Sequence, residues 1–466
     1  MFSKRHGLVS IQKRAALQSL IDLYVRIENE TAHIASERIR HAEPFNMRLK
    51  QKLLTWCVAQ LLFATLSAWS ADLTSEELKG VLKQVSLRNT WFMYSIEDGK
   101  NHSYHLRNDG SLEDCSPSFS KMQQFGIGSN TKMMTALLVI QAVEEGRLKL
   151  DARIDEIAHQ IEAADLKAGR PMRPIEVHPD FHQITLKNLL THHAGFPGVE
   201  TADFEYPRQG GRDALMRKIL RMGPVGYRQE SRDAPFCFDY SNEGYAVLGE
   251  VLERISDPSD SFENLLRNKI FIPLGIDQCR LISKSEALQQ AGIPASNQVD
   301  TRELDPLISP ATGASCNLND WMTFIRHIMN GINGHPTSQA VLRKPESFEI
   351  LKETQENCFY GAGALMLSEE PSAAYHFGAN GIHSSLIWFE LGQLEKGKGT
   401  SFVVVSTEPF NEVSGKFYLL AQLIQGKTSP AKKLVQIRIP APHCVLGSDS
   451  EDLAELANPL EREGRR

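Results

Sequence analysis

The pattern of apolar and polar positions differs between the two ends of the chain and its middle. Residues 89–106, "NTWFMYSIEDGKNHSYHL", predict two strands joined at an Asp-Gly turn. Apolar residues at helical spacing predict a helix over 129–145 that ends at Gly146. The same spacing predicts further helices from Ser241 onward and around "LNDWMTFIRHIMNG".

Beyond residue 355 the pattern becomes that of strands. The segments "YGAGALML", "AAYHFG", "SSLIWFEL" and "TSFVVVSTEP" predict successive short strands, and "VSGKFYLLAQLIQ" predicts a helix after them. Strands at both ends with helices between them indicate an α/β (α+β) fold. We expect a sheet whose first and last parts pair and into which an all-helical lobe is inserted.

A separate apolar run, residues 53–69, follows a short cationic segment. The cationic head, the apolar middle and the small residues Ala68 and Ser70 are typical of a signal peptide over 47–70, cleaved after Ser70. This pattern predicts a periplasmic or secreted protein. The alternative is an uncleaved anchor at 53–69, which would hold the protein on a membrane.

The signal-peptide pattern also divides the rest of the chain. Residues 1–46 precede it and are either an N-terminal extension or a stretch upstream of a true start at Met47. Residues 71–430 carry the strand and helix patterns and are expected to form the main domain. The last segment, 431–466, lacks a strong apolar pattern and is expected to be a tail.

Composition narrows the range of partners. The 466-residue chain is 41% hydrophobic and 23% charged, and its formal net charge is −6 at pH 7. A negative chain offers no broad cationic field for phosphates, so no nucleic-acid partner is expected. Of the seven cysteines, Cys57 lies in the apolar run and leaves six, an even number as disulfides require. The Cys and His spacings are not those of metal ligands, so we expect no metal and no cofactor.

A serine and a lysine, Ser129 and Lys132, stand three residues apart where the first long helix is predicted to begin. The spacing alone is weak evidence, because the chain contains three other Ser-x-x-Lys pairs. Only this pair follows a Gly-rich approach, "FGIG", and opens a strongly apolar helix, whose free N–H groups favour negative charge. A serine nucleophile needs a nearby base, and a lysine can be that base if burial lowers its pKa. The alternative is a helix-capping serine beside a solvated lysine.

Two later motifs change the balance between these alternatives. Tyr240 and Asn242 form "YSN" at the entry to a predicted helix, and His376 begins "HFG" at the end of a predicted strand. A phenol can share a proton with the serine and the lysine, and an amide can orient the lysine or hold a substrate carbonyl. The edge of a strand can bind an extended substrate. Together the three motifs favour nucleophilic catalysis.

The ordered set "SNTK", "YSN" and "HFG" resembles the three motifs of class C type serine β-lactamases and their relatives, the D,D-peptidases, D-aminopeptidases and family VIII esterases. "LLTHHAGFP", "GRLKLDARI" and "PATGASCNLNDWMTFIRHIMNG" resemble other segments of that family, so the similarity covers residues 85 to 425. The resemblance implies a β-lactamase/transpeptidase-like fold, in which an antiparallel sheet is flanked by helices and carries an all-helical lobe. It also implies an active site at the seam between the two.

The resemblance further implies a role for each motif residue. Ser129 would be the nucleophile that becomes acylated, and Lys132 with Tyr240 would form the acid/base pair. Asn242 would orient Lys132 or the substrate amide. His376 would line the site beside Tyr240.

The third motif is where the chain departs from an efficient class C β-lactamase, which has Lys-Thr-Gly or Lys-Ser-Gly. Here His376 replaces the cation, and Phe377 replaces a threonine that helps to bind the carboxylate of a penicillin or a terminal D-alanine. A phenyl ring cannot donate that hydrogen bond. Gly378 and Ala379 would line the substrate-binding edge, and the N–H of Ala379 would form an oxyanion hole with that of Ser129. We therefore expect weak or absent β-lactamase activity and an ester, amide or D-amino-acid peptide as the small-molecule or peptide substrate.

Two alternatives stay open. A true β-lactamase or D,D-carboxypeptidase would use the same residues, and a penicillin-recognising or inactive binding protein would acylate slowly or never. An α/β-hydrolase with a Ser-His-Asp triad is disfavoured, because the chain has no Gly-x-Ser-x-Gly motif. His192, His193 and His383 are accordingly expected to be loop or structural residues and not a general base.

Overall fold

The computed structural model describes most of the predicted main domain. The described residues are 75–95, 100–198, 204–226, 235–294, 302–336, 341–355, 360–363, 365–367, 373–392 and 399–428. The predicted extension 1–46, signal segment 47–70 and tail 431–466 lie outside these residues. From Glu76 to Ala421 the described chain belongs to one compact unit.

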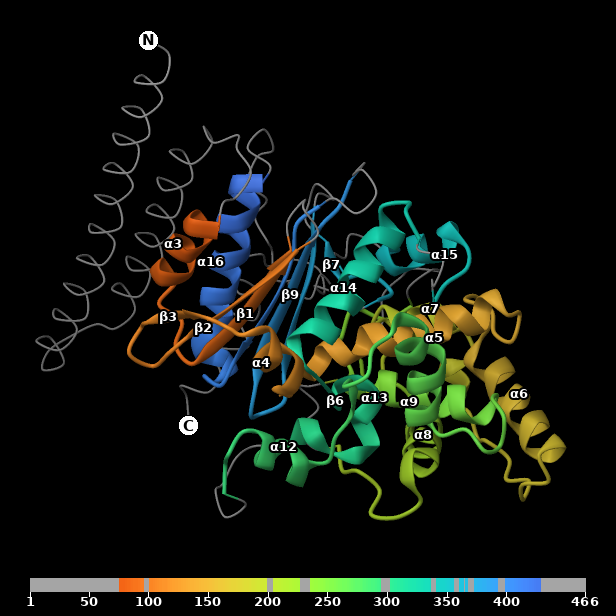
Figure 1. The fold of residues 1–466 in the computed structure, drawn as a ribbon. Coiled ribbons are helices and arrows are strands. Elements are labelled where there is room, and N and C mark those ends of the chain that lie inside the picture. The colour runs from red at the N-terminus through yellow and green to blue at the C-terminus, as the bar shows by residue number, and fades with distance from the viewer. Residues whose placement is uncertain are drawn as a thin grey trace, which may run out of the picture. The chain divides into compact units, whose positions relative to one another are not determined.

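Seven strands form one antiparallel sheet, seen edge-on near the centre of Figure 1. Their spatial order is β3 (Leu112–Asp114), β2 (Asn101–Leu106), β1 (Thr90–Ser95), β10 (Ser401–Ser406), β9 (Ser384–Glu390), β8 (Ala373–Ala379) and β7 (Met366–Leu367). Strand β1 from the start of the domain pairs with β10 from its end, with Thr90 opposite Ser406. The predicted pairing of the first and last parts of the chain is confirmed.

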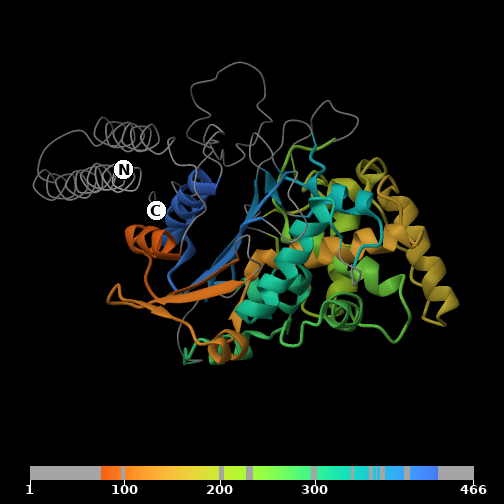
Figure 2. The same ribbon diagram turned by 45° about the horizontal axis from the view of Figure 1, so that its top comes forward.

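Helices cover both faces of this sheet (Figures 1 and 2). Helices α3 (Ser75–Gln84) and α16 (Phe410–Thr428) lie on one face. Helix α14 (Leu318–Ile332) lies on the other face, where it contacts β1, β9 and β10. Its buried Trp321, Ile325 and Ile328 recur at helical spacing, so one apolar side of α14 covers the sheet.

The predicted helical lobe is made by the helices between β3 and β7. Besides α14, the α-helices of this stretch are α4 (Pro117–Met122), α5 (Thr131–Glu144), α6 (Ile154–Lys167), α7 (Leu186–Leu190), α8 (Gly211–Met222), α9 (Asn242–Arg254), α10 (Phe262–Leu266), α11 (Ile272–Leu274), α12 (Lys284–Gln290), α13 (Ser309–Thr312) and α15 (Pro345–Glu349). Shorter 3-10 or π turns are η1 (Gly128–Asn130), η2 (Pro179–Phe181), η3 (Arg267–Phe271), η4 (Arg302–Leu304), η5 (Pro306–Ile308) and η6 (Ile350–Lys352).

Helix α5 runs through the interior of this lobe. Every residue from Thr131 to Ile140 is buried, because the helix is apolar on almost all sides and packs against α9 and α13. The turn η1 leads directly into α5 and contacts β8 and β9. Ser129 therefore lies where the helical lobe meets the sheet.

A second, small sheet stands beside η1, and the sequence pattern did not predict it. Its strands, in spatial order, are β4 (Phe125–Gly126), β6 (Ala314–Cys316) and β5 (Arg280–Leu281). A disulfide joins Cys279 to Cys316, and Cys237 is disulfide-bonded as well, whereas Cys115 is a free thiol. The Cys279–Cys316 bond links positions 37 residues apart and so restricts the unfolded chain.

Candidate active site

Ser129 lies in η1, one turn before α5, and its side chain is partly exposed. The turn packs closely on β8: Gly128 has a φ of +54°, and a Cβ there would lie 2.5 Å from the backbone N of Ala379. A glycine permits both the left-handed backbone and this approach. Gly128 thus contacts the backbone of Ala379, and Ser129 is the next residue along the chain. This arrangement suits the predicted oxyanion hole, which would use the N–H groups of Ser129 and Ala379.

Polar bonds hold η1 against the sheet. Asn130 Nδ2 donates to Ser385 Oγ over 2.9 Å, and Ser385 Oγ donates to the carbonyl oxygen of Ile127 over 2.9 Å. A Cβ at Gly378 would overlap both that carbonyl and the Ser385 hydroxyl. Gly378 is thus required for the close packing of β8 on η1.

Lys132 lies fully buried in the first turn of α5. Its Nζ donates to Ser129 Oγ over 3.2 Å, to Asn242 Oδ1 over 2.6 Å and to the carbonyl oxygen of Ala311 over 3.3 Å. Burial lowers the pKa of Lys132 to about 7, although the carboxylates of Glu303 and Glu243 oppose the shift. A large fraction of Lys132 is therefore neutral near pH 7 and able to accept a proton.

Tyr240 is the second group beside the nucleophile. Its hydroxyl is hydrogen-bonded to Ser129, and Lys132 Nζ lies 4.6 Å from the centroid of its ring. Burial of the hydroxyl raises the pKa of Tyr240 well above its ordinary value, although the ring keeps some exposed surface. Tyr240 therefore keeps its proton at neutral pH, whereas Lys132 can lose one.

Asn242 begins α9, where the side chain of Ser241 caps the helix by accepting from Gly244 N over 3.0 Å. Both ends of the Asn242 amide are used: Oδ1 accepts from Lys132, and Nδ2 donates to Glu303 Oε2 over 2.9 Å. Of the two expected roles, the contacts favour orientation of Lys132.

His376 is buried on β8, and its Nε2 is hydrogen-bonded to the hydroxyl of Tyr360. Burial lowers the pKa of His376 well below its ordinary value, and the charge of Lys132 lowers it further. The ring is therefore neutral at pH 7. His376 occupies the place of the cation in the third motif but does not supply its charge.

The ring of Phe377 packs 5.9 Å, centroid to centroid, from Tyr375 and from Phe410 of α16. Neighbouring residues of a strand point to opposite faces, so this ring belongs to the packing between β8 and α16. The position supplies no hydroxyl, as the sequence indicated.

Strand β7 pairs with only part of β8. Its described residues lie opposite Tyr375 and Ala374, so within the described residues β7 does not pair with β8 from His376 onward.

Two residues that the sequence did not assign to the site are found there. His192 was expected to be a loop or structural residue; it follows α7, has a φ of +62°, and stacks on Tyr240 with ring centroids 4.5 Å apart. Its Nδ1 accepts from Ser241 N over 3.1 Å, which fixes the ring but leaves Nδ1 unable to act as a base. Tyr360, named only within "YGAGALML", contacts Tyr240, His192 and His376 through its ring.

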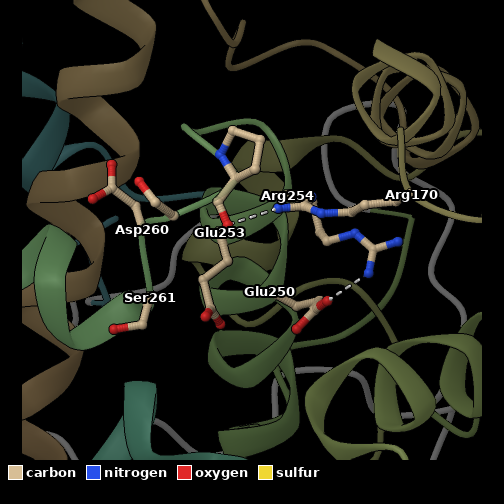
Figure 3. A pocket seen from close by; sticks show the side chains of 8 residues that line it. Arg170, Glu250, Glu253, Arg254, Asp260 and Ser261 are labelled. Carbon is tan, nitrogen blue, oxygen red and sulfur yellow. Dashed lines mark hydrogen bonds and ion pairs between the residues drawn. The ribbon is translucent and has the colours of Figure 1, made fainter. Parts of the chain in front are cut away.

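A hollow of about 360 Å³ occurs elsewhere in the helical lobe (Figure 3). It is lined by Arg170, Glu250, Glu253, Arg254, Pro258, Ser259, Asp260 and Ser261. Arg254 pairs with Asp165 and Glu250, and Arg170 pairs with Asp165, so these charges neutralise one another. Glu250 also lies about two helical turns along α9 from Asn242. This hollow is a structural ion-pair network and not the site of Ser129.

The described residues contain neither a candidate metal site nor a helix suited to cross a membrane. In the part of the chain that the structure covers, no cluster of three or more His, Cys, Asp or Glu side chains is arranged to hold a metal ion. Within the same residues, no helix combines the length and the apolar character needed to cross a membrane.

The fold and the site define the class of protein. The chain matches the profile of the family described as Beta-lactamase over residues 96–425, more than half of its length. The protein belongs to this family, and its mixed fold, with an antiparallel seven-stranded sheet and many helices, is the β-lactamase/transpeptidase fold.

Two curated relatives illustrate the range of the family. Penicillin-binding protein 4 of Amycolatopsis lactamdurans is 31% identical over 167 residues, which cover 35% of this chain and 38% of that protein. Lovastatin esterase of Penicillium rubens is 26% identical over 158 residues, which cover 32% of this chain and 37% of that protein. This chain thus matches less than two fifths of the length of either relative.

Among solved structures, a class C β-lactamase from Rhodobacter sphaeroides is similar with a TM-score of 0.50 at 15% identity. The match covers 75% of this chain and 98% of that one. At this identity the similarity establishes the fold and leaves the substrate open.

Proposed function

We propose that the protein is a serine hydrolase that forms an acyl-enzyme on Ser129 and cleaves an ester, amide or D-amino-acid peptide bond. The observation that carries the proposal is the 3.2 Å bond between Lys132 Nζ and Ser129 Oγ, with the pKa of Lys132 lowered to about 7. A buried lysine that is partly neutral at pH 7 meets the need of a serine nucleophile for a nearby base.

The reaction follows from these contacts. Ser129 Oγ bonds to the substrate carbonyl carbon while its proton passes to Lys132 Nζ, and the N–H groups of Ser129 and Ala379 stabilise the oxyanion. Tyr240 gives its proton to the leaving oxygen or nitrogen as the bond to the carbonyl carbon breaks, and Lys132 reprotonates Tyr240. Water then attacks the acyl-enzyme by the same proton path, which releases the acid and restores Ser129.

The contacts around the third motif support a substrate without a carboxylate at this position. His376 is neutral and bonded to Tyr360, and Phe377 has no hydroxyl to donate. The similarity to a lovastatin esterase adds support for an ester.

The test is acylation and turnover in wild type and in Ser129→Ala. Intact-protein mass after exposure to p-nitrophenyl butanoate should show an acyl adduct in wild type and none in the variant. A panel of p-nitrophenyl esters, D-amino-acid amides, D-Ala-D-Ala peptides and cephalosporins then ranks the substrates. Equal turnover by wild type and Ser129→Ala would refute the proposal.

A second candidate is a penicillin-recognising protein that acylates and then stalls. It is favoured by the 31% identity to a penicillin-binding protein. A β-lactam adduct that persists for hours, together with no ester turnover, would support this candidate. A nitrocefin rate comparable to that of a good short-chain ester would instead indicate a true β-lactamase.

We also propose that the protein is exported, with the 47–70 segment as its signal. The Cys279–Cys316 disulfide supports this, because such bonds persist in oxidising compartments. Cell fractionation and N-terminal sequencing of the protein made in a bacterial host test the proposal. A mature protein that starts at Ala71 is expected, and cytoplasmic retention of the intact chain would contradict export.

A further inference from the structure

Ala379, the last residue of β8, directs its backbone N and O at Gly128. A Cβ at Gly128 would lie 2.5 Å from each of these two atoms. In an antiparallel sheet the N–H and C=O of one residue point to the same edge of the strand, and those of the next residue point to the other edge. Ala379 therefore points its polar backbone groups at η1, which holds Ser129, whereas Asn380 points its own away from η1.

Asn380 closes the turn that joins β8 to β9. Its N–H donates to the carbonyl oxygen of His383 over 3.2 Å, and its Oδ1 accepts from Ile382 N over 3.1 Å and from His383 N over 2.8 Å. An asparagine side chain that bonds the backbone two or three residues further on is typical of a tight turn. The side chain is fully buried, so its removal would take the acceptor away from two buried N–H groups.

The amide nitrogen of the same side chain lies against the segment that leads to the nucleophile. A Cβ at Gly126 of β4 would overlap Asn380 Nδ2, so this amide fills the place of a side chain at that glycine. Strand β4 is followed at once by η1 and Ser129. One buried side chain thus contacts β4 and also fixes the turn next to Ala379.

We propose that Asn380 is a positioning residue for the oxyanion hole, because it fixes the N–H of Ala379 relative to that of Ser129. The inference rests on the proposed acylation of Ser129 and adds a residue that acts through Ala379. Hydrogen bonds to an oxyanion depend on distance and direction, so a small shift of one donor weakens the stabilisation. Without Oδ1 of Asn380 the turn loses two of its bonds, and Ala379 shifts with it.

The test compares an ester with its thionoester, in which sulfur replaces the carbonyl oxygen. The pair is p-nitrophenyl butanoate and O-(p-nitrophenyl) butanethioate, and release of p-nitrophenol is followed for both. Sulfur is a weak hydrogen-bond acceptor, so the oxyanion hole stabilises the thionoester reaction much less. The measured quantity is the ratio of kcat/KM for the ester to that for the thionoester. Both values come from one preparation, so the ratio does not depend on the fraction of protein that is folded.

In wild type we expect the ester to be preferred by about 100-fold or more, which is the effect of an oxyanion-hole donor. Asn380→Ala should lower this ratio about tenfold, because the ester loses a stabilisation that the thionoester barely has. Asn380→Ser keeps a hydroxyl that can accept in the same turn, so its ratio should lie between those of wild type and Asn380→Ala. The serine variant decides the question if Asn380→Ala does not fold.

Asn333→Ala is the matched control. Asn333 Nδ2 donates to the carbonyl oxygen of Glu390 over 3.1 Å, and its Oδ1 accepts from Gly392 N over 2.9 Å. This amide also joins backbone groups, but at the other end of β9 from the turn of Asn380. Its loss should lower the stability and leave the ratio within about twofold, because distant sites act independently.

The outcomes separate the two proposals. If p-nitrophenyl butanoate is hydrolysed by wild type and not by Ser129→Ala, but the Asn380 variants keep the wild-type ratio, the positioning role is refuted and the serine hydrolase stands. The role is also refuted if wild type shows no preference for the ester, or if Asn333→Ala lowers the ratio as much as Asn380→Ala. If no ester turnover depends on Ser129, both proposals fail.

Discussion

The hydroxyl of Tyr360 is hydrogen-bonded both to Nε2 of His376 and to Tyr240. The bond to Tyr360 lowers the pKa of Tyr240 against the effect of burial, as expected when the Tyr360 hydroxyl donates to the Tyr240 oxygen. A hydroxyl has a single proton, so Tyr360 must then accept from an Nε2–H of His376. Tyr360 is thus a positioning residue for Tyr240.

Tyr360→Phe should lower kcat about tenfold while KM changes little, because the ring and its packing stay and one hydrogen bond to the proton-transfer group is lost. Steady-state kinetics with a p-nitrophenyl ester measures both constants. Tyr245→Phe is the control, since that hydroxyl donates to the Leu190 carbonyl over 2.8 Å and not to Tyr240. An equal loss of kcat in the two variants would show that Tyr360 acts only through packing.

Lys132 should make the activity rise with pH. Its pKa is lowered to about 7, and only the neutral amine can take the proton of Ser129, so the active fraction grows as the pH rises from 6 to 8. The pH profile of kcat/KM checks this direction. Lys132→Arg, which stays protonated, should lower kcat/KM by about 100-fold or more at pH 8. A profile that falls across this range would contradict Lys132 as the base.

Gly378 should tolerate no side chain. A Cβ there meets the Ile127 carbonyl and the Ser385 hydroxyl, so Gly378→Ala should separate β8 from η1, cost about 2 kcal/mol of folding free energy and lower the activity. Urea unfolding and ester hydrolysis measure the two effects. Gly415→Ala is the matched control, because nothing lies within 4 Å of its Cβ, and in helix α16 it should stabilise by up to about 1 kcal/mol. Equal stabilities for the two variants would contradict the close contact.

Glu250, in the hollow of Figure 3, should make stability fall as the pH rises. Burial raises its pKa to about 7, and the neighbouring Glu253 adds to the shift. The folded state therefore holds the proton more tightly than the unfolded chain, whose carboxyl has a pKa near 4.5. The stability from this group is complete below about pH 4.5 and is lost as the pH rises through about 7.

Glu250→Gln should accordingly stabilise the protein at pH 8, by about 2 kcal/mol, and have little effect at pH 4.5. Urea unfolding of wild type and variant at both pH values measures the difference. Glu253→Gln serves as the control, because Glu253 pairs with Arg212 and its loss should destabilise at pH 8. Destabilisation of Glu250→Gln at pH 8 would show that its bond to Arg254 outweighs the cost of burial.

The sequence by itself determined the local elements and the order of the motifs. The hairpin of β1 and β2, helix α5 and the strands β8 to β10 follow from short-range periodicity, which depends only on neighbouring residues. Ser129 and Lys132 are three residues apart at the start of a helix, so their contact is also local. The small sheet of β4, β5 and β6 escaped prediction because two of its strands have only two residues and show no period.

Tertiary structure alone decided the electrostatics and the second layer of the site. The lowered pKa values of Lys132 and His376 come from burial, which requires the packed lobe and sheet and cannot be read from residue spacing. Glu303 and Tyr360 meet the motif residues only through folding, because Glu303 lies 61 positions from its partner Asn242 and no local pattern marks either residue. The motifs therefore indicated the kind of chemistry, whereas long-range packing set the protonation of each group.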